Sequence, residues 1–134
     1  MALPINILII CEGKEEQAKF TEIVRMSGMR AVCCANLNEA RSILARQEIQ
    51  AVICEEILTD GSFQEVLRQS RRSPEELPVI VFSNSSEWDT YLRVIRGGAF
   101  DCIAYPPVHA EVARKLWHAL RQAKHHTEIA MGAT

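Results

Sequence analysis

Short apolar runs alternate with amphipathic stretches five times along this 134-residue chain, and this alternation constrains the fold more than any other feature. The runs are brief and several are rich in β-branched residues, which favours buried strands over helices. The stretches between them carry apolar residues at helical spacing. The expected strands are residues 5–10, 30–34, 51–54, 77–82 and 101–104. The expected helices are residues 15–27, a second helix capped by Asn36 or Asn38, and residues 63–69, 88–96 and 108–124.

Strands that alternate with helices predict an α/β fold with a parallel sheet, because each parallel pair needs a crossover connection. The helices then cover both faces of the sheet. Five strands favour the flavodoxin-like, doubly wound order 2-1-3-4-5. We expect one domain at residues 1–124 and a frayed C-terminal tail at residues 125–134.

Composition narrows the class of protein. The net charge is −2 and no basic stripe is present, so no nucleic-acid partner is expected. No apolar run approaches the roughly 18 residues that span a bilayer, and no charged region precedes the first run, so no membrane association is expected. The five cysteines are odd in number and form no CxxC motif. This pattern indicates reduced, mostly buried thiols and a cytoplasmic location.

In doubly wound folds, ligands bind beyond the carboxyl ends of the strands, near the point where the winding direction changes. The residues that follow each expected strand are therefore the candidates for a site. A thiol, several carboxylates, a hydroxyl and a phenol occupy these positions. They are Cys11 and Glu12, Glu55 and Glu56, Ser83, and Tyr105 and Pro106.

The segment that follows the first strand, "CEGKEE", allows three readings. A phosphate-binding P-loop needs a glycine where Leu8 stands, and a cysteine phosphatase of the C-x5-R kind needs an arginine where Gln17 stands. Both readings fail, and the acid beside Cys11 disfavours a reactive thiolate. We therefore expect Cys11 to be a packing residue. The remaining reading is an acidic pocket of the kind that holds Mg²⁺.

The strand ends carry a family resemblance. The segments "NILII" with its acidic turn, "AVICEE…DG", "LPVIVFS" and "GAFDCIAYPP" resemble the receiver domain of bacterial two-component response regulators, from about Asn6 to Arg121. The resemblance implies a phosphorelay signalling module with partners that are other signalling proteins or a second copy of the chain. It also implies a binding face on the fourth helix, the fifth strand and the fifth helix.

The resemblance also assigns roles to individual residues. It places the phosphoacceptor position at Glu55, which is normally an aspartate. It places the paired acids that hold the metal at Cys11 and Glu12, and the Ser/Thr switch at Ser83. The lysine that reaches the phosphoryl group corresponds to Tyr105.

Two further positions follow from the same resemblance. The aromatic switch corresponds to Cys102, and the Tyr105–Pro106 bond is expected to be cis. Tyr105 either fills the pocket, with its hydroxyl near Glu12 or Glu55, or packs outside it. Glu56 is expected at the surface. Asp60, expected in a turn, is a distant second candidate for the acceptor.

These departures predict a degenerate receiver. The lysine cation is absent, and Cys11 is a poor ligand for Mg²⁺, which prefers oxygen. We expect no firm cofactor, only weak Mg²⁺ binding, no enzymatic activity, and a stand-alone module that acts through protein–protein interaction. Two alternatives stay open: a working Mg²⁺-dependent phosphoacceptor receiver that uses Glu55, and a small flavodoxin-like enzyme that uses Cys11.

Overall fold

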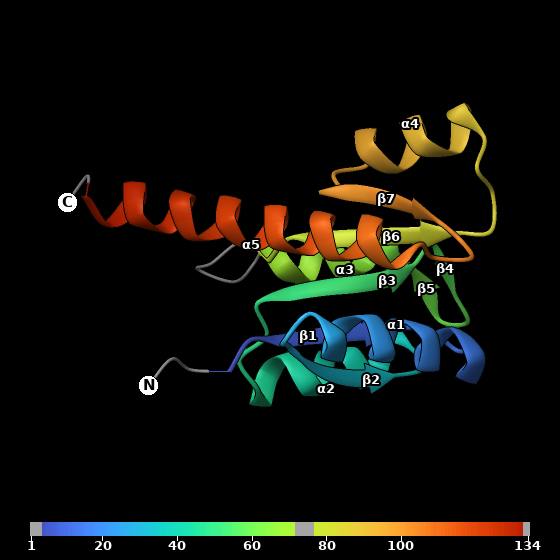
Figure 1. The fold of residues 1–134 in the computed structure, drawn as a ribbon, viewed down its shortest axis with the longest axis horizontal. Helices are drawn as coiled ribbons and strands as arrows, with labels where there is room; N and C mark the ends of the chain where they lie inside the picture. The colour runs from blue at the N-terminus through green and yellow to red at the C-terminus, as the bar shows by residue number, and fades with distance from the viewer. Residues whose placement is uncertain (1–3, 72–76, 133–134) are drawn as a thin grey trace.

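The structure, a computed structural model, describes residues 4–71 and 77–132. A five-stranded parallel sheet forms the middle layer, with helices on both faces (Figure 1). The strands of this sheet are β1 (Asn6–Ile10), β2 (Arg30–Cys34), β3 (Ala51–Glu55), β6 (Val79–Ser83) and β7 (Asp101–Ala104). The helices are α1 (Lys14–Met26), α2 (Leu37–Arg46), α3 (Phe63–Arg71), α4 (Trp88–Arg96) and α5 (His109–Gly132).

The strand order of the large sheet is β2-β1-β3-β6-β7, and every pair is parallel. This order confirms the predicted 2-1-3-4-5 topology and the flavodoxin-like fold. The register places Glu55 opposite Phe82, so β3 and β6 end side by side. Because parallel strands share one direction, the candidate residues that follow β1, β3, β6 and β7 lie along one edge of the sheet.

Alternating side chains along the strands build a separate core on each face of the sheet. Ile7 and Ile9 pack with α1 and α5, whereas Leu8 and Ile10 pack with α2, α3 and α4. All four of these side chains are fully buried. Strands that are buried on both faces explain the nearly continuous apolar runs in the sequence.

Local signals in the sequence set several helix ends. Asn36, and not Asn38, caps α2, since its side chain accepts a hydrogen bond from the Glu39 N–H at 2.9 Å. The Glu39 carboxylate accepts in return from the Ala35 N–H at 2.8 Å. This pair resembles a capping box, except that Glu39 accepts from the residue before the N-cap. Gly28, with φ of 83°, follows the end of α1 and adopts a conformation that favours glycine.

Two parts of the structure differ from the sequence-based expectation. The segment after β3, expected as an irregular loop, contains a small antiparallel hairpin of β4 (Ile57–Leu58) and β5 (Gly61–Ser62). Strands of two residues are too short to show a periodic pattern in the sequence.

The last helix, α5, continues to Gly132, past its expected end at Lys124, and its C-terminal part extends beyond the sheet (Figure 1). The domain limits at residues 1–124 and the fraying of residues 125–134 stay predictions, and residues 133–134 lie outside the described ranges. Even this longest of the described helices lacks the apolar length that crossing a membrane requires, as do the others.

Candidate functional site

Cys11 is a packing residue, as predicted. Its side chain is fully buried and its Sγ lies 3.8 Å from the carbonyl oxygen of Gly13. Gln17 closes the turn, because its Nε2 donates to the carbonyl oxygens of Cys11 at 2.7 Å and Cys34 at 3.3 Å. Burial, with a smaller contribution from Glu55, raises the pKa of Cys11 to about 12. The thiol is therefore protonated at neutral pH.

The acids that follow β1 and β3 lie next to each other. The backbone N–H of Glu12 donates to Oε1 of Glu55 over 3.5 Å. The side chain of Glu12 is exposed, whereas that of Glu55 is partly buried. Burial raises the pKa of Glu55, the hydrogen bond from Glu12 lowers it, and the nearby Glu16 and Glu12 carboxylates raise it further. The two acids thus form a pair of like charges at this edge.

Glu56 belongs to the site, and the expected surface position is wrong. Its side chain is only 14% exposed. Ser83 Oγ donates to Glu56 Oε1 over 3.2 Å, and Arg93 of α4 forms an ion pair with Glu56 Oε2. Ser83 itself is buried at the end of β6 and accepts from the Ser85 N–H at 3.2 Å. The carboxylate is thus held between a strand end and a helix.

The side chain of Tyr105 packs toward α1. Its ring centroid lies 6.4 Å from that of Phe20 and 6.1 Å from that of Phe82, and Lys19 Nζ lies 5.2 Å from the Tyr105 centroid. The Tyr105 hydroxyl is buried and has no hydrogen-bond partner within the described ranges. Of the two alternatives for Tyr105, the one with a hydrogen bond to Glu12 or Glu55 is therefore not seen among these residues. The Tyr105–Pro106 bond is cis, as predicted.

Cys102, where the resemblance places the aromatic switch, is a buried member of the core that faces α2, α3 and α4. Burial raises the pKa of its thiol. Its carbonyl oxygen accepts a hydrogen bond from Lys115 Nζ at 2.7 Å. This position therefore carries a small core side chain and no ring that could turn between two environments.

Asp60 has a role that the sequence did not reveal. Its two carboxylate oxygens accept the N–H groups of Leu37 at 2.9 Å and Asn38 at 3.0 Å. These hydrogen bonds, led by that of Leu37, lower the pKa of Asp60. Asp60 is therefore a long-range cap of α2, and both of its oxygens are occupied.

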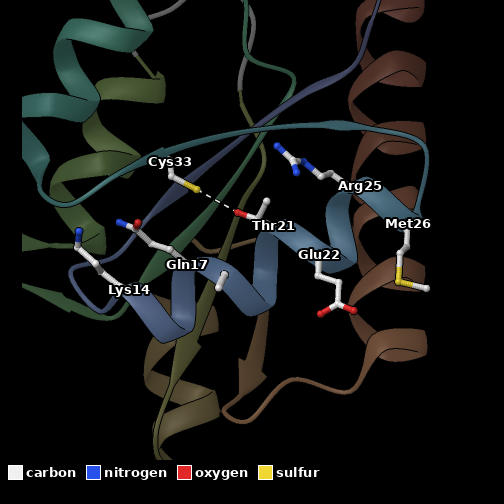
Figure 2. Close-up of a pocket in the computed structure, with 8 residues that line it drawn as sticks. Lys14, Gln17, Thr21, Glu22, Arg25, Met26 and Cys33 are labelled. Atoms are coloured by element: carbon white, nitrogen blue, oxygen red, sulfur yellow. Dashed lines mark hydrogen bonds between the residues drawn. The ribbon is translucent and has the colours of Figure 1, made fainter.

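Two hollows lie near these residues. One, of about 330 Å³, opens at the ends of β3 and β6, and its lining includes Glu55, Glu56 and Ser83 but neither Glu12 nor Tyr105. The other, of about 560 Å³, runs along α1, where Thr21 Oγ1 and Cys33 Sγ form a hydrogen bond of 3.2 Å (Figure 2). Tyr105 therefore does not line the acidic hollow, although Phe82, which contacts the Tyr105 ring, does.

The donor set at the strand ends does not fit Mg²⁺. The Cys11 thiol is buried and directed toward a backbone carbonyl, and Mg²⁺ demands oxygen ligands in octahedral geometry. Glu56 is occupied by Ser83 and Arg93. Within residues 4–71 and 77–132, no cluster of three or more His, Cys, Asp or Glu is arranged to hold a metal ion.

Comparison of sequences gives a weak similarity to a response regulator. No family model matches the chain. A stretch of 71 residues is 28% identical to the response regulator protein PilR of Pseudomonas aeruginosa. The match covers 53% of this chain and spans only 16% of the length of PilR.

Comparison of structures gives a clear fold. A signal receiver domain from Vibrio parahaemolyticus has a TM-score of 0.83 at 18% identity, covering 95% of this chain and 98% of that one. A CheY-like receiver domain protein from Methanospirillum hungatei has a TM-score of 0.80 at 14% identity, covering 92% and 99%. A two-component response regulator from Clostridium difficile has a TM-score of 0.77 at 21% identity, covering 87% and 96%. The chain has the fold of the receiver domains of two-component response regulators.

Proposed function

We propose that this chain is a receiver-like signalling module of the two-component phosphorelay type that acts by binding other proteins and not by phosphotransfer. The observation that carries the proposal is the packing of Tyr105. At the position where the resemblance places a lysine, a phenol ring packs beside Phe20 and Phe82 instead of directing a cation toward the acids. Phosphotransfer needs positive charge to stabilise the transferring group, so its loss disfavours the reaction.

The state of Glu55 supports the same proposal. Its carboxylate already accepts the Glu12 N–H, and it lies in a partly buried position beside other acids. A second anion brought to this edge would meet repulsion. The extra methylene of glutamate, compared with aspartate, also displaces the nucleophile, and a displacement near 1 Å costs on the order of a hundredfold in rate.

Incubation with a small acyl-phosphate donor and Mg²⁺, followed by intact-mass spectrometry, tests the proposal. We expect no gain of a phosphoryl group, whereas an active receiver domain treated in parallel gains one. A stoichiometric gain that is lost in Glu55→Gln would overturn the proposal and establish the working phosphoacceptor receiver. Asp60→Asn serves as a matched control, since Asp60 lies outside the acidic hollow.

The geometry disfavours the alternative of an enzyme that uses Cys11. A nucleophilic cysteine needs a lowered pKa and access to substrate, and Cys11 has a raised pKa and full burial. All five cysteines are free thiols, which is consistent with action in the reducing cytoplasm.

The proposed partner is another signalling protein or a second copy of the chain. Exposed aromatic side chains suit such a contact, and three of them lie on α4 and α5: Trp88, Tyr91 and Trp117. Light scattering coupled to size exclusion separates the two partners. A dimer that Trp88→Ala or Trp117→Ala disrupts supports self-association, and a monomer at high concentration supports a partner of another kind.

A further inference from the structure

The Glu56 carboxylate connects the sheet to α4 through both of its oxygens. Oε1 accepts the hydroxyl of Ser83 at the end of β6, and Oε2 pairs with the guanidinium of Arg93 in the last turn of α4. The backbone of Glu56 is itself fixed, because its N–H donates to the carbonyl oxygen of Phe82 at 3.0 Å. The carboxylate is therefore a defined point on the sheet to which the helix is attached.

A second chain of hydrogen bonds leads from the same point to the start of α4. The Ser85 N–H donates to Ser83 Oγ, and Ser85 Oγ in turn accepts from Thr90 Oγ1 at 3.1 Å and from the Glu87 N–H at 3.2 Å. Glu87 is the N-cap residue of α4. Both ends of the helix are thus connected to Glu56, one through the serines and one through Arg93.

Apolar contacts also attach the helix, since Val94 is buried in the core and Ile95 packs against it. The helix is nine residues long, and its buried residues are Thr90 and Val94. A helix of this length is unstable by itself in water and depends on tertiary contacts. The Glu56 side chain is largely buried, so loss of its partners would leave an unsatisfied charge. The polar attachment therefore adds to these apolar contacts in holding α4 in place.

The outer side of α4 carries an exposed aromatic pair. The rings of Trp88 and Tyr91 stack with centroids 5.3 Å apart and planes inclined by 18°, and both side chains are exposed. We propose that Glu56 is a positioning residue. Its carboxylate fixes α4 in one arrangement, and the Trp88–Tyr91 pair is fixed with the helix. The role of that pair in partner binding rests on the proposed function.

Hydrogen exchange of the isolated chain, read by mass spectrometry on peptides from α4, tests this role. In Glu56→Gln and in Arg93→Gln, we expect the α4 amides to exchange faster by on the order of tenfold, the effect of removing a charged hydrogen bond from a partly exposed site. The double variant should exchange no faster than the faster single variant, because both changes remove the same attachment.

Glu55→Gln is the matched control, since it makes the same chemical change one residue away at a carboxylate that contacts Glu12 and not α4. Its α4 amides should exchange no faster than those of the wild type. Wild-type α4 exchange in Glu56→Gln and Arg93→Gln, or an equal acceleration in Glu55→Gln, would overturn the proposal. Peptides from β1 and β3 report global unfolding. If Glu56→Gln also accelerates exchange in β1 and β3, the α4 exchange of Arg93→Gln decides whether the ion pair holds the helix. The Arg93 side chain is 60% exposed, so its loss leaves the core intact.

This experiment uses neither a phosphodonor nor a partner. Its failure would therefore leave the proposed function standing, with α4 held by other contacts. A phosphoryl gain in the mass assay would overturn the proposed function and leave the role of Glu56 in positioning α4 untouched.

Discussion

The unpaired hydroxyl of Tyr105 leads to a prediction that runs against the usual effect of a buried substitution. This atom is buried, and no residue in the described part of the chain accepts or donates a hydrogen bond to it. Lys19 Nζ lies 5.2 Å from the ring centroid, and the Tyr105 hydroxyl is the main cause of a raised Lys19 pKa, so this cation lies near the hydroxyl as well as the ring but outside hydrogen-bond geometry. Tyr105→Phe keeps the ring and its neighbours and removes only the hydroxyl. We expect the variant to be more stable than the wild type.

The size of the effect follows from the cost of a buried polar group without a partner, which is about 1–3 kcal/mol. Because the rest of the Tyr105 side chain is partly exposed, we expect the lower end, an increase of about 1 kcal/mol in the free energy of unfolding. For a domain of this size, that corresponds to a rise of about 3–5 °C in Tm. Tyr105→Leu should instead be destabilising, because each aromatic contact with Phe20 and Phe82 contributes about 0.5–1.5 kcal/mol beyond burial.

Urea denaturation followed by circular dichroism measures both variants against the wild type. Equal denaturant slopes would show that the comparison is between similar folded and unfolded states. A loss of 1 kcal/mol or more in Tyr105→Phe would refute the reasoning, since it would mean that the hydroxyl has a partner. A neutral Tyr105→Leu would refute the ring packing itself.

Three further predictions concern single ionisable groups. Iodoacetamide should label Cys33 first in the folded protein, because Cys33 is exposed and the other four cysteines are buried. Peptide mapping measures the labelling, and equal labelling of Cys11 would contradict the prediction. Glu55→Gln should raise the free energy of unfolding at neutral pH. The folded-state pKa of Glu55 is raised, so the contribution of Glu55 to stability falls as pH rises through that pKa. In acid, where Glu55 is protonated, the difference from the wild type should vanish. Asp60→Asn should lower the free energy of unfolding at neutral pH. The folded-state pKa of Asp60 is lowered, so the stabilising contribution of Asp60 is present above its unfolded-state pKa and is lost as pH falls. Denaturation at several pH values measures both, and a pH-independent difference would contradict either prediction.

Much of the fold follows from the sequence because burial on both faces of a parallel sheet produces apolar runs that are easy to recognise. The ranges of β2, α4 and β7 agree with the expected ranges, and the strand order follows from the crossover rule. The hairpin of β4 and β5 was not predicted, since two-residue strands carry no period. The end of α5 at Gly132 also lies beyond the predicted end, because helix ends are set by few local signals.

The candidate site was less predictable, because the side-chain directions depend on tertiary packing. Glu56 resembles any loop acid in the sequence, and only the placement of Arg93, 37 positions later, shows that it is paired. Asp60 caps a helix that begins 23 positions earlier, a contact that no local motif announces. The direction of Tyr105 depends on the space beside Phe20 and Phe82.

Tyr105 and Glu56 are linked by charge. A largely buried carboxylate is stabilised by a nearby cation, and a tyrosine after β7 cannot supply one. Here Arg93 of α4 supplies the cation, and Glu56 rather than Glu55 receives it. The compensating charge therefore comes from a helix that carries an exposed aromatic pair. As a result, the electrostatic balance of the edge and the position of α4 depend on the same ion pair, so a change in one must affect the other.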